Sequence, residues 1–234
     1  MKGIVLAGGL GKRMRPLTKE ENKHYLPVYK SRMIEYPVQT LVDMGIKDIV
    51  LITGGQKAEK FFELFRDGSS FGIDRLYYTY QEGSGGISDA LSYAQPFLEP
   101  DESCTVILGD NYFEDVPEQQ ELSGAQIFLQ KTETPWHFGI AEVSGDQVIN
   151  IEEKPSKPQS DLAVVGLYQF DSTVWDKISK IELSARGELE ITDLLNLYIE
   201  EGTLGYQMYN GYWSDMGTFQ SWMKVSQRVA SRCI

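Results

Sequence analysis

The first 110 residues alternate between short apolar runs of strand length and longer stretches in which apolar residues recur at helical spacing. Strands are recognised by runs of four to eight apolar or alternating residues, and helices by a repeat of about 3.6 residues. The predicted order is strand 3–7, helix 33–45, strand 48–53, helix 57–65, strand 75–80, helix 87–98 and strand 105–110. Repeated β-α-β units of this kind predict an α/β fold with a Rossmann-like, doubly wound sheet.

After Asp110 the pattern changes, because four apolar runs follow one another with short polar links and no room for crossover helices. They span 125–131, 138–143, 147–153 and 163–170. Such strands pair antiparallel or in a mixed sheet, since parallel neighbours need a long crossover. Toward the C-terminus we expect a helix, two short strands and a last amphipathic helix. These span 191–202, 205–209, 211–215 and the residues from 218 onward.

No internal repeat, low-complexity tract or linker interrupts the sequence, and the segment nearest to a long loop is 154–160, which contains two prolines. The length of 234 residues is sufficient for one large α/β domain with a substantial core. We therefore expect one continuous domain over residues 1–234.

The chain carries 34 acidic against 22 basic side chains and a net charge of −12. Such a surface repels nucleic acid and anionic membranes, so we expect neither as a partner, and any polyanionic ligand needs a local positive patch. No apolar run is long enough for a membrane span or a signal peptide. Cys104 and Cys233 show no zinc or redox spacing, which favours a reducing compartment and idle thiols. We expect a soluble, cytoplasmic protein.

The segment AGGLGKRMR, residues 7–15, leads from the first predicted strand into three glycines and three cations. Glycines after a strand let the backbone approach a ligand closely, and turn N–H groups there can form an anion-binding nest. The stretch from Lys12 to Lys23 holds five cations and two carboxylates, an excess of three positive charges in an acidic protein. The segment is a candidate phosphate-binding loop; the alternative is a plain glycine turn with solvated charges.

Two common phosphate loops do not fit this segment. A Walker loop requires a glycine five positions before Gly11 and Ser or Thr after the lysine, but Leu6 and Arg13 stand there. The dinucleotide pattern G-x-G-x-x-G has Met14 in place of its third glycine, which disfavours a nicotinamide-dependent oxidoreductase.

The whole sequence resembles the sugar-1-phosphate nucleotidyltransferases, and within them the glucose-1-phosphate thymidylyltransferases. The resemblance begins with GIVLAGGLGKRMRPLT and NKHYLPV near the N-terminus. It continues, in family order, through QEGSGGISDAL, LGDN, FGIAEV, IEEKP, AVVGLY, ARGELEITD and WSDMGT. It implies the nucleotide-diphospho-sugar transferase type of α/β fold, with a nucleotide-binding half at 1–115 and a sugar-binding half at 116–234.

The resemblance implies that the phosphate of a hexose 1-phosphate attacks the α-phosphorus of dTTP or UTP, and that pyrophosphate leaves. Two polyanions must then be brought together, so catalysis consists of positioning and charge neutralisation. The expected product is a nucleotide sugar, dTDP-glucose in the first instance. UTP with another hexose phosphate, or a regulatory subunit that binds nucleotide sugars without turnover, are the alternatives.

For the nucleotide, the resemblance implies that Arg13, Lys23 and Asp110 are catalytic, with the two cations neutralising charge in the reaction. It places a pyrimidine base against Gln81 and Gly86; a glutamine amide offers the donor and acceptor that match such a base. Lys12 stands where the family usually has Thr or Ser. The full set of expected nucleotide contacts is Leu6, Ala7, Gly8, Gly9, Gly11, Lys12, Arg13, Gln81, Gly86 and Asp110.

For the metal and the sugar, the resemblance implies Mg²⁺ held by Asp110 and Asp215, since paired carboxylates suit an ion that keeps several waters. Expected sugar-phosphate contacts are Gly139, Glu153, Lys154, Val164 and Arg186. Glu188, Glu190 and Asp193 are expected to organise the helix start, and His24 and His137 to have packing or surface roles. Longer relatives carry an extra C-terminal helical segment, so we expect no end-product regulatory site and an assembly simpler than a tetramer, compatible with a homodimer.

Overall fold

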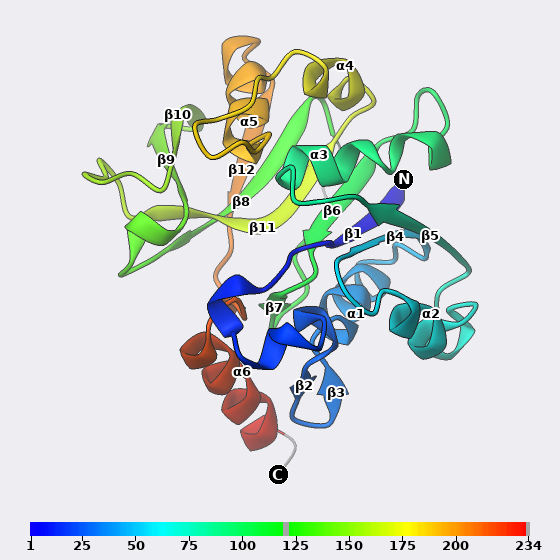
Figure 1. Ribbon diagram of the computed structural model, residues 1–234. Coiled ribbons are helices and arrows are strands. Elements are labelled where there is room, and N and C mark those ends of the chain that lie inside the picture. Colours follow the sequence, from blue (N-terminus) through cyan, green and yellow to red (C-terminus); the bar gives the residue numbers. More distant parts are fainter. Residues whose placement is uncertain (119–121, 233–234) are drawn as a thin grey trace. The chain divides into compact units, whose positions relative to one another are not determined.

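The computed structural model describes residues 1–118 and 122–232, so Cys233 lies outside the described residues. The chain forms two compact units, each built from separate stretches of sequence (Figure 1). Unit 1 comprises residues 1–84, 107–118 and 211–234, and unit 2 comprises 85–106 and 119–210. The division of nucleotide and sugar functions between 1–115 and 116–234 stays a prediction.

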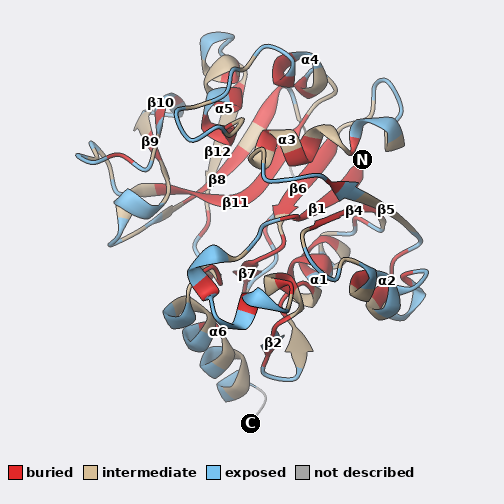
Figure 2. Ribbon diagram, in the orientation of Figure 1, coloured by how far each residue is buried: buried red, intermediate tan, exposed pale blue. Residues whose placement is uncertain are grey.

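Unit 1 contains three parallel strands, β1 (Lys2–Ala7), β4 (Asp48–Gly54) and β5 (Arg75–Gln81). The crossover from β1 to β4 contains α1 (Glu35–Asp43), and that from β4 to β5 contains α2 (Glu59–Phe65). Both connections are the β-α-β units predicted from the sequence. Every residue of β1 is buried, as expected of a strand covered on both faces (Figure 2).

Two small antiparallel ribbons complete unit 1. One pairs β2 (Pro27–Val28) with β3 (Ser31–Arg32), and the other pairs β7 (Asn111–Phe113) with β13 (Trp213–Asp215). The last helix, α6 (Phe219–Arg232), contacts β2 and β13 and buries Val225. Its remaining surface is intermediate or exposed (Figure 2).

Unit 2 is built on mostly antiparallel strands: β8 (Ala125–Lys131), β9 (Gly139–Ser144), β10 (Gln147–Glu153) and β11 (Leu162–Phe170). A fifth, β12 (Leu204–Met208), runs parallel to β8, so this sheet is mixed as predicted. Helices α3 (Ile87–Ser92), α4 (Val174–Ile178) and α5 (Ile191–Glu200) pack against one another, and α5 also contacts β10 and β12. The strand β6 (Cys104–Leu108) leads from unit 2 into unit 1.

The predicted strands and helices are confirmed as elements, and four of the helices, α1, α2, α3 and α5, are shorter than predicted. The helix expected at 87–98 ends at Ser92, and a separate helical turn follows at Gln95–Phe97, where Pro96 cannot continue a helix. The strands β2, β3 and β7 and the helix α4 were not predicted, because two to five residues are too few to establish a period. The loop at 154–160 lacks regular structure, as predicted.

Two expectations about sulfur and membranes can be compared with the described residues. Cys104 is a free thiol enclosed in β6, where burial raises the pKa of the thiol and keeps it protonated. Within residues 1–118 and 122–232, no helix combines the length and the apolar character needed to cross a membrane.

Candidate active site

The glycines after β1 form a tight turn that requires their lack of a side chain. Gly11 has a left-handed backbone with φ 61°, and its carbonyl accepts a hydrogen bond of 2.7 Å from Thr18 Oγ1. A Cβ on Gly11 would lie 2.9 Å from side-chain carbons of both Lys23 and Thr18. The loop of residues 8–11, called here the glycine loop, is therefore packed directly against the segment that carries Lys23.

The helical turn Lys12–Met14 follows the glycine loop and separates charge from apolar surface. Met14 is fully buried, whereas Lys12 and Arg13 are exposed, with 58% of the Arg13 side chain accessible. Because Met14 anchors the turn, the two preceding cations face outward at a fixed place, as a phosphate-binding loop requires.

Lys23 and Asp110 form a tight and largely enclosed ion pair. Lys23 Nζ lies 2.6 Å from Asp110 Oδ2, and the two side chains are only 13% and 11% accessible. The other carboxylate oxygen, Asp110 Oδ1, accepts a hydrogen bond of 3.0 Å from Asn111 Nδ2. Asn111 Oδ1 in turn accepts from Trp213 Nε1 at 2.6 Å. The structure thus brings together two predicted catalytic residues that are 87 positions apart in the chain.

Asp215 reaches the same region through the β7–β13 ribbon. It pairs in register with Asn111, and the N–H of Met216 donates to the carbonyl of Asp110 at 2.7 Å. Arg13 Nη2 lies 3.7 Å from Asp215 Oδ2. A Cβ on Gly217 would meet Arg13 Nη2 at 2.6 Å, so the guanidinium lies directly against the backbone of Gly217. Arg13, Lys23, Asp110 and Asp215 form one cluster of alternating charge in unit 1.

The two aspartates have opposite pKa shifts. Burial alone would raise the pKa of Asp110, but the Lys23 ammonium, followed by hydrogen bonds from Lys23 and Asn111, holds it below its usual range. Burial raises the pKa of Asp215, and the negative charge of Asp110 raises it further, against the opposing effect of Arg13 and Lys23. The repulsion between these carboxylates is what a bound cation would relieve.

This donor set fits Mg²⁺ only as part of a shared coordination shell. Among the described residues, no group of three or more His, Cys, Asp or Glu side chains is placed to hold a metal ion. Two carboxylates are what Mg²⁺ commonly takes from a protein when phosphate oxygens and waters supply the other ligands. The residues therefore suit a metal that arrives with a phosphate-bearing substrate.

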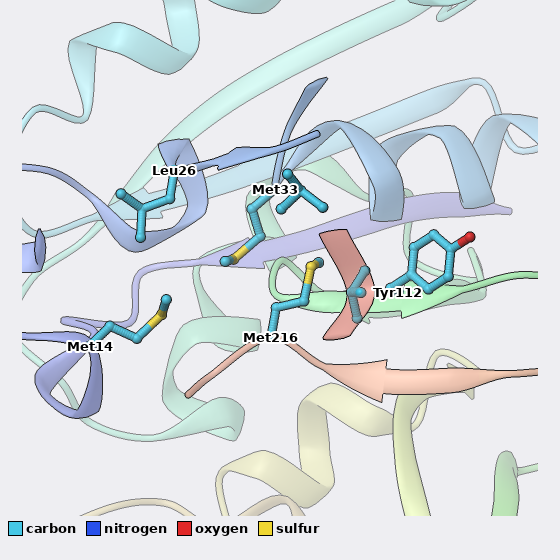
Figure 3. Close-up of a cluster of buried hydrophobic side chains, with 7 residues drawn as sticks. Met14, Leu26, Met33, Tyr112 and Met216 are labelled. Carbon is cyan, nitrogen blue, oxygen red and sulfur yellow. The ribbon is translucent and has the colours of Figure 1, made fainter. Parts of the chain in front are cut away.

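An apolar cluster lies behind this charged site. Figure 3 shows Met14, Leu26, Met33 and Met216 converging, with Tyr112 beside them. The whole methionine cluster consists of Met14, Leu26, Val28, Met33, Tyr112, Met216 and Val225. Four of its members lie within three positions of a predicted site residue: Met14 follows Arg13, Leu26 follows Lys23, Tyr112 follows Asp110 and Met216 follows Asp215. Buried neighbours thus fix each loop at the base of the site.

Gln81 and Gly86, predicted to bind the base, fall in different units and are described separately. Gln81 ends β5 in unit 1, is 4% exposed and lies directly over Gly8 of the glycine loop. Gly86 immediately precedes α3 in unit 2 with φ 103°, and a Cβ there would meet the carbonyl oxygen of Leu189 at 2.6 Å. Leu6 and Ala7 form the buried end of β1.

In unit 2, Glu153, Lys154, Arg186 and Glu190 form the second charged cluster. The Arg186 guanidinium donates two hydrogen bonds to the Glu190 carboxylate, from Nε to Oε1 at 3.1 Å and from Nη2 to Oε2 at 2.7 Å. Arg186 Nη2 also lies 3.1 Å from Glu153 Oε1, which accepts from Lys154 Nζ at 2.5 Å. Both predicted phosphate-binding cations of unit 2 are therefore paired with acids in this structure.

The remaining predicted sugar contacts lie near this cluster or on the adjoining strands. Gly139 begins β9, and a Cβ there would lie 3.5 Å from Glu153 Oε2. Lys154 has a left-handed backbone with φ 47°, and its N–H donates to the carbonyl of Phe138. Val164 is buried in β11. Gly139, Glu153 and Lys154 are thus brought together by the β9–β10 hairpin.

Several residues at these sites were missed or excluded by the sequence reasoning. Glu190 was left out of the site, yet it is 8% exposed and holds Arg186. Asn111 and Gly217 belonged to quoted motifs but were given no role. Asn111 contacts Trp213, 102 positions away, and Gly217 lies against Arg13 near the other end of the chain, and no local signal exists for such contacts. His137 is exposed and His24 is buried, as their predicted surface and packing roles require.

An α/β fold with a glycine loop, outward-facing cations and two neighbouring aspartates is typical of enzymes that act on phosphate groups. Residues 2–232 match the family described as nucleotidyl transferase. The chain belongs to this nucleotidyltransferase family.

Curated and solved relatives agree with that membership. The chain is 40% identical over 231 residues to a glucose-1-phosphate thymidylyltransferase of Neisseria meningitidis, covering 94% of this chain and 80% of the relative. It is also 41% identical, with a TM-score of 0.90, to a crystal structure from Bacillus anthracis whose assignment as a glucose-1-phosphate thymidylyltransferase is provisional and which holds a sucrose. That alignment covers 97% of this chain and 94% of the other.

A more distant structure shares the fold alone. It is a UDP-glucose pyrophosphorylase in complex with UDP-glucose, with a TM-score of 0.83 at 18% identity, covering 99% of this chain and 98% of the other. The mixed α/β fold with a parallel core is thereby confirmed. The protein is a nucleotidyltransferase similar to the glucose-1-phosphate thymidylyltransferases.

Proposed function

We propose that this enzyme transfers a nucleotidyl group from dTTP to glucose 1-phosphate, giving dTDP-glucose and pyrophosphate. The observation that carries the proposal is the cluster of Arg13, Lys23, Asp110 and Asp215 in unit 1. A relative 40% identical over most of the chain is named for this activity, which supports dTTP and glucose 1-phosphate as the first substrates to test.

The reaction needs no covalent enzyme intermediate. An oxygen of the sugar phosphate forms a bond to the α-phosphorus of the nucleotide, and the bond from that phosphorus to the bridging oxygen breaks, leaving its electron pair on pyrophosphate. Both reactants are anionic, so the main barrier the protein can lower is their mutual repulsion and disorder.

In this proposal, Arg13 and the amides of the glycine loop hold the triphosphate and stabilise the pyrophosphate as it leaves. Lys12 adds a further positive charge at the mouth of the loop. Lys23 stabilises the charge that develops around the α-phosphorus. Its low accessibility supports that role, because an ammonium partly removed from water interacts more strongly with a phosphate.

Asp110 and Asp215 are the residues that would hold Mg²⁺. When bound, the ion would neutralise phosphate oxygens and help to align them. Asp110 has a second function in the protein itself: its ion pair keeps the Lys23 ammonium oriented into the site.

Gln81, in unit 1, is the proposed contact for the base edge, and the backbone of Gly86, in unit 2, is a further proposed nucleotide contact. The position of Gln81 over Gly8 supports this assignment, since a base bound there would extend the same nucleotide whose phosphates occupy the glycine loop. Thymine and uracil present the same N3–H and carbonyl pattern, so this contact favours a pyrimidine without ranking dTTP over UTP.

Unit 2 is the proposed sugar-phosphate site. Gly139 offers a backbone N–H, Glu153 accepts from sugar hydroxyls, and Val164 contributes apolar surface. Lys154 and Arg186 bind the phosphate. Since these two cations are paired with acids in the structure, phosphate binding would exchange one charged partner for another.

A pyrophosphate-release assay tests the proposal directly. The enzyme is incubated with Mg²⁺, one of the four ribonucleotides or dTTP, and one of several hexose 1-phosphates. We expect the highest kcat/KM with dTTP and glucose 1-phosphate, and a measurable kcat about 100- to 1000-fold lower with Lys23→Ala.

A preference for UTP or another hexose 1-phosphate would redirect the substrate assignment, and binding without turnover would favour a regulatory subunit. Titration with an NAD analogue is the negative control. Light scattering after size exclusion tests the oligomeric state. A tetramer would contradict the prediction of an assembly simpler than a tetramer.

A further inference from the structure

Two buried polar residues flank Lys23 and have no part in the proposed reaction. Asn22 is 5% exposed and His24 is 2% exposed, whereas Lys23 between them points toward Asp110. Burying polar side chains is unfavourable unless they are hydrogen-bonded. Both side chains must therefore have hydrogen-bond partners within the protein.

The amide of Asn22 connects two parts of unit 1. Its Nδ2 donates to the carbonyl of Gly54 at 2.9 Å, which identifies Oδ1 as the acceptor. Oδ1 accepts from the backbone N–H of His24 at 3.0 Å and lies 3.0 Å from His24 Nδ1. The ring also makes a hydrogen bond to the backbone of Ala7 at the end of β1. Burial, together with the Lys23 charge, lowers the pKa of His24 to about 3, so the ring stays neutral.

The groups reached by this amide are also those that shape the site. Gly54 ends β4, and a Cβ on it would lie 2.9 Å from the Cα of Gly8 in the glycine loop. The His24 ring fills the space beside Gly109, where a Cβ would meet it at 3.0 Å, immediately before Asp110. Asn22 and His24 therefore occupy the junction of β4, the glycine loop and the segment that ends in Asp110.

Lys23 needs such support because its own turn is short. The turn Lys23–Tyr25 has only three residues, and turns of that length are not stable alone. Its far end is held by backbone bonds from Ile34 to His24 and from Met33 to Leu26, both of 2.9 Å. The near end is capped by the Asn22 side chain. Without the Asn22 cap, the hydrogen bonds at the far end of the turn alone would hold the backbone of Lys23.

We propose that Asn22 is a positioning residue for Lys23, fixing the turn to the end of β4 so that the ammonium is oriented before substrates bind. The inference rests on the proposed catalytic role of Lys23. A purely structural asparagine would contribute to folding stability alone. If Asn22 is a positioning residue, its removal must in addition lower turnover, and it must do so through Lys23 and through no other group.

A double-mutant cycle separates these possibilities. The variants are Asn22→Ala, Lys23→Ala and the double variant, assayed for kcat and KM with dTTP and glucose 1-phosphate. We expect Asn22→Ala to lower kcat about 10- to 100-fold while the KM for dTTP changes less than about threefold. In the Lys23→Ala background, the same change should lower kcat less than about threefold, because the group it positions is gone.

Two further variants control for folding. Asn22→Ser keeps a capping oxygen for the His24 N–H but loses the bond to Gly54, and should recover part of the lost turnover. Tyr198→Phe removes a buried hydroxyl that lies 3.3 Å from Thr173 Oγ1 in unit 2, and should lower the Tm without lowering kcat. If Asn22→Ala does not fold, the serine variant carries the same cycle.

Each result has a distinct meaning. Unchanged kcat in Asn22→Ala, or an equal loss in both backgrounds, would overturn the positioning role while leaving the proposed function intact. Full turnover in Lys23→Ala alone would instead remove the catalytic role of Lys23, and the inference with it. If Asn22→Ala lowers kcat only in the protein that retains Lys23, Asn22 is established as a positioning residue.

Discussion

The two charged clusters of this protein hold their cations differently. In unit 1, Lys23 is 13% accessible, is paired with Asp110 and stands on a turn backed by the methionine cluster. In unit 2, Lys154 and Arg186 are 42% and 43% accessible and share Glu153 as a partner. Unit 1 thus contains a cation that is held in place before any ligand binds, whereas the cations of unit 2 are solvated and free to exchange partners.

This difference suggests a division of labour in the reaction. A buried, oriented ammonium is worth most where charge develops in the transition state, because it needs no reorganisation at that moment. Solvated cations bind phosphate in the ground state and are weakened by water and salt. We therefore expect changes in unit 1 to alter kcat and changes in unit 2 to alter KM.

The largest effect is expected at Lys23. Lys23→Ala should lower kcat about 100- to 1000-fold, as for loss of one oriented charge-stabilising donor, while nucleotide affinity falls much less. Steady-state kinetics and calorimetric titration with dTTP measure the two quantities. A loss of affinity equal to the loss of kcat/KM would make Lys23 a ground-state contact and remove the contrast between the units.

The next effect is expected at the aspartates. Asp110→Asn and Asp215→Asn should each raise the Mg²⁺ concentration for half-maximal rate about 10-fold or more, since each removes a charged ligand. Asp110→Asn should also lower kcat at saturating Mg²⁺, because it removes the partner that orients Lys23. Magnesium titrations of both variants test this, and identical behaviour would show that the Lys23–Asp110 pair has no separate role.

A smaller effect is expected in unit 2. Arg186→Gln should raise the KM for the sugar phosphate about 10-fold with little change in kcat, because the guanidinium is solvated and partly neutralised by Glu190. The KM should also rise with added salt in the wild type. A fall in kcat with unchanged KM would place Arg186 among the oriented cations and contradict the comparison.

The smallest effect is expected at the anchor of α6. Glu114 accepts from Arg228 at 2.7 Å through both carboxylate oxygens, and Arg232 Nη1 lies 2.8 Å away. The hydrogen bond from Arg228, with that from Arg232, lowers the pKa of Glu114 from 4.5 to about 2. Because the arginine side chains are exposed, we expect the ion pair between Glu114 and Arg228 to contribute only about 1 kcal/mol to the free energy of unfolding.

The sign of its pH dependence follows from the lowered pKa. A carboxyl with a folded-state pKa below its usual 4.5 stabilises the protein above that pH, and the stabilisation is lost as the pH falls toward 2. Glu114→Gln should therefore lower the Tm by about 2–4 °C at pH 7, and by progressively less below pH 4.5. Thermal unfolding of both proteins across this range is the measurement. A constant difference at all pH values would assign the effect to packing.

Local sequence was sufficient for most of the elements and for the candidate phosphate-binding loop, whereas the other proposed site residues were implied by the family resemblance. The apolar runs before Asp110 predicted the β-α-β order, and the glycines beside three cations marked the loop after β1. These signals survive folding because periodicity, turn preference and charge are properties of neighbouring residues. The expectation of mixed or antiparallel pairing in the second half was likewise correct, since the short links excluded crossover helices.

The arrangement of the site was decided by tertiary structure. Nothing local indicates that residues 211–234 return to unit 1, or that the three-residue strands β7 and β13 pair so that Asp215 joins Asp110. The bond between Trp213 and Asn111 spans 102 positions, and Lys23 is packed against the glycine loop and paired with Asp110, which is 87 positions away. The sequence determined which charges are present and on which elements they lie. Only the packed chain determined which of them are buried, paired and held in place, because burial and pairing depend on neighbours that are distant in the sequence.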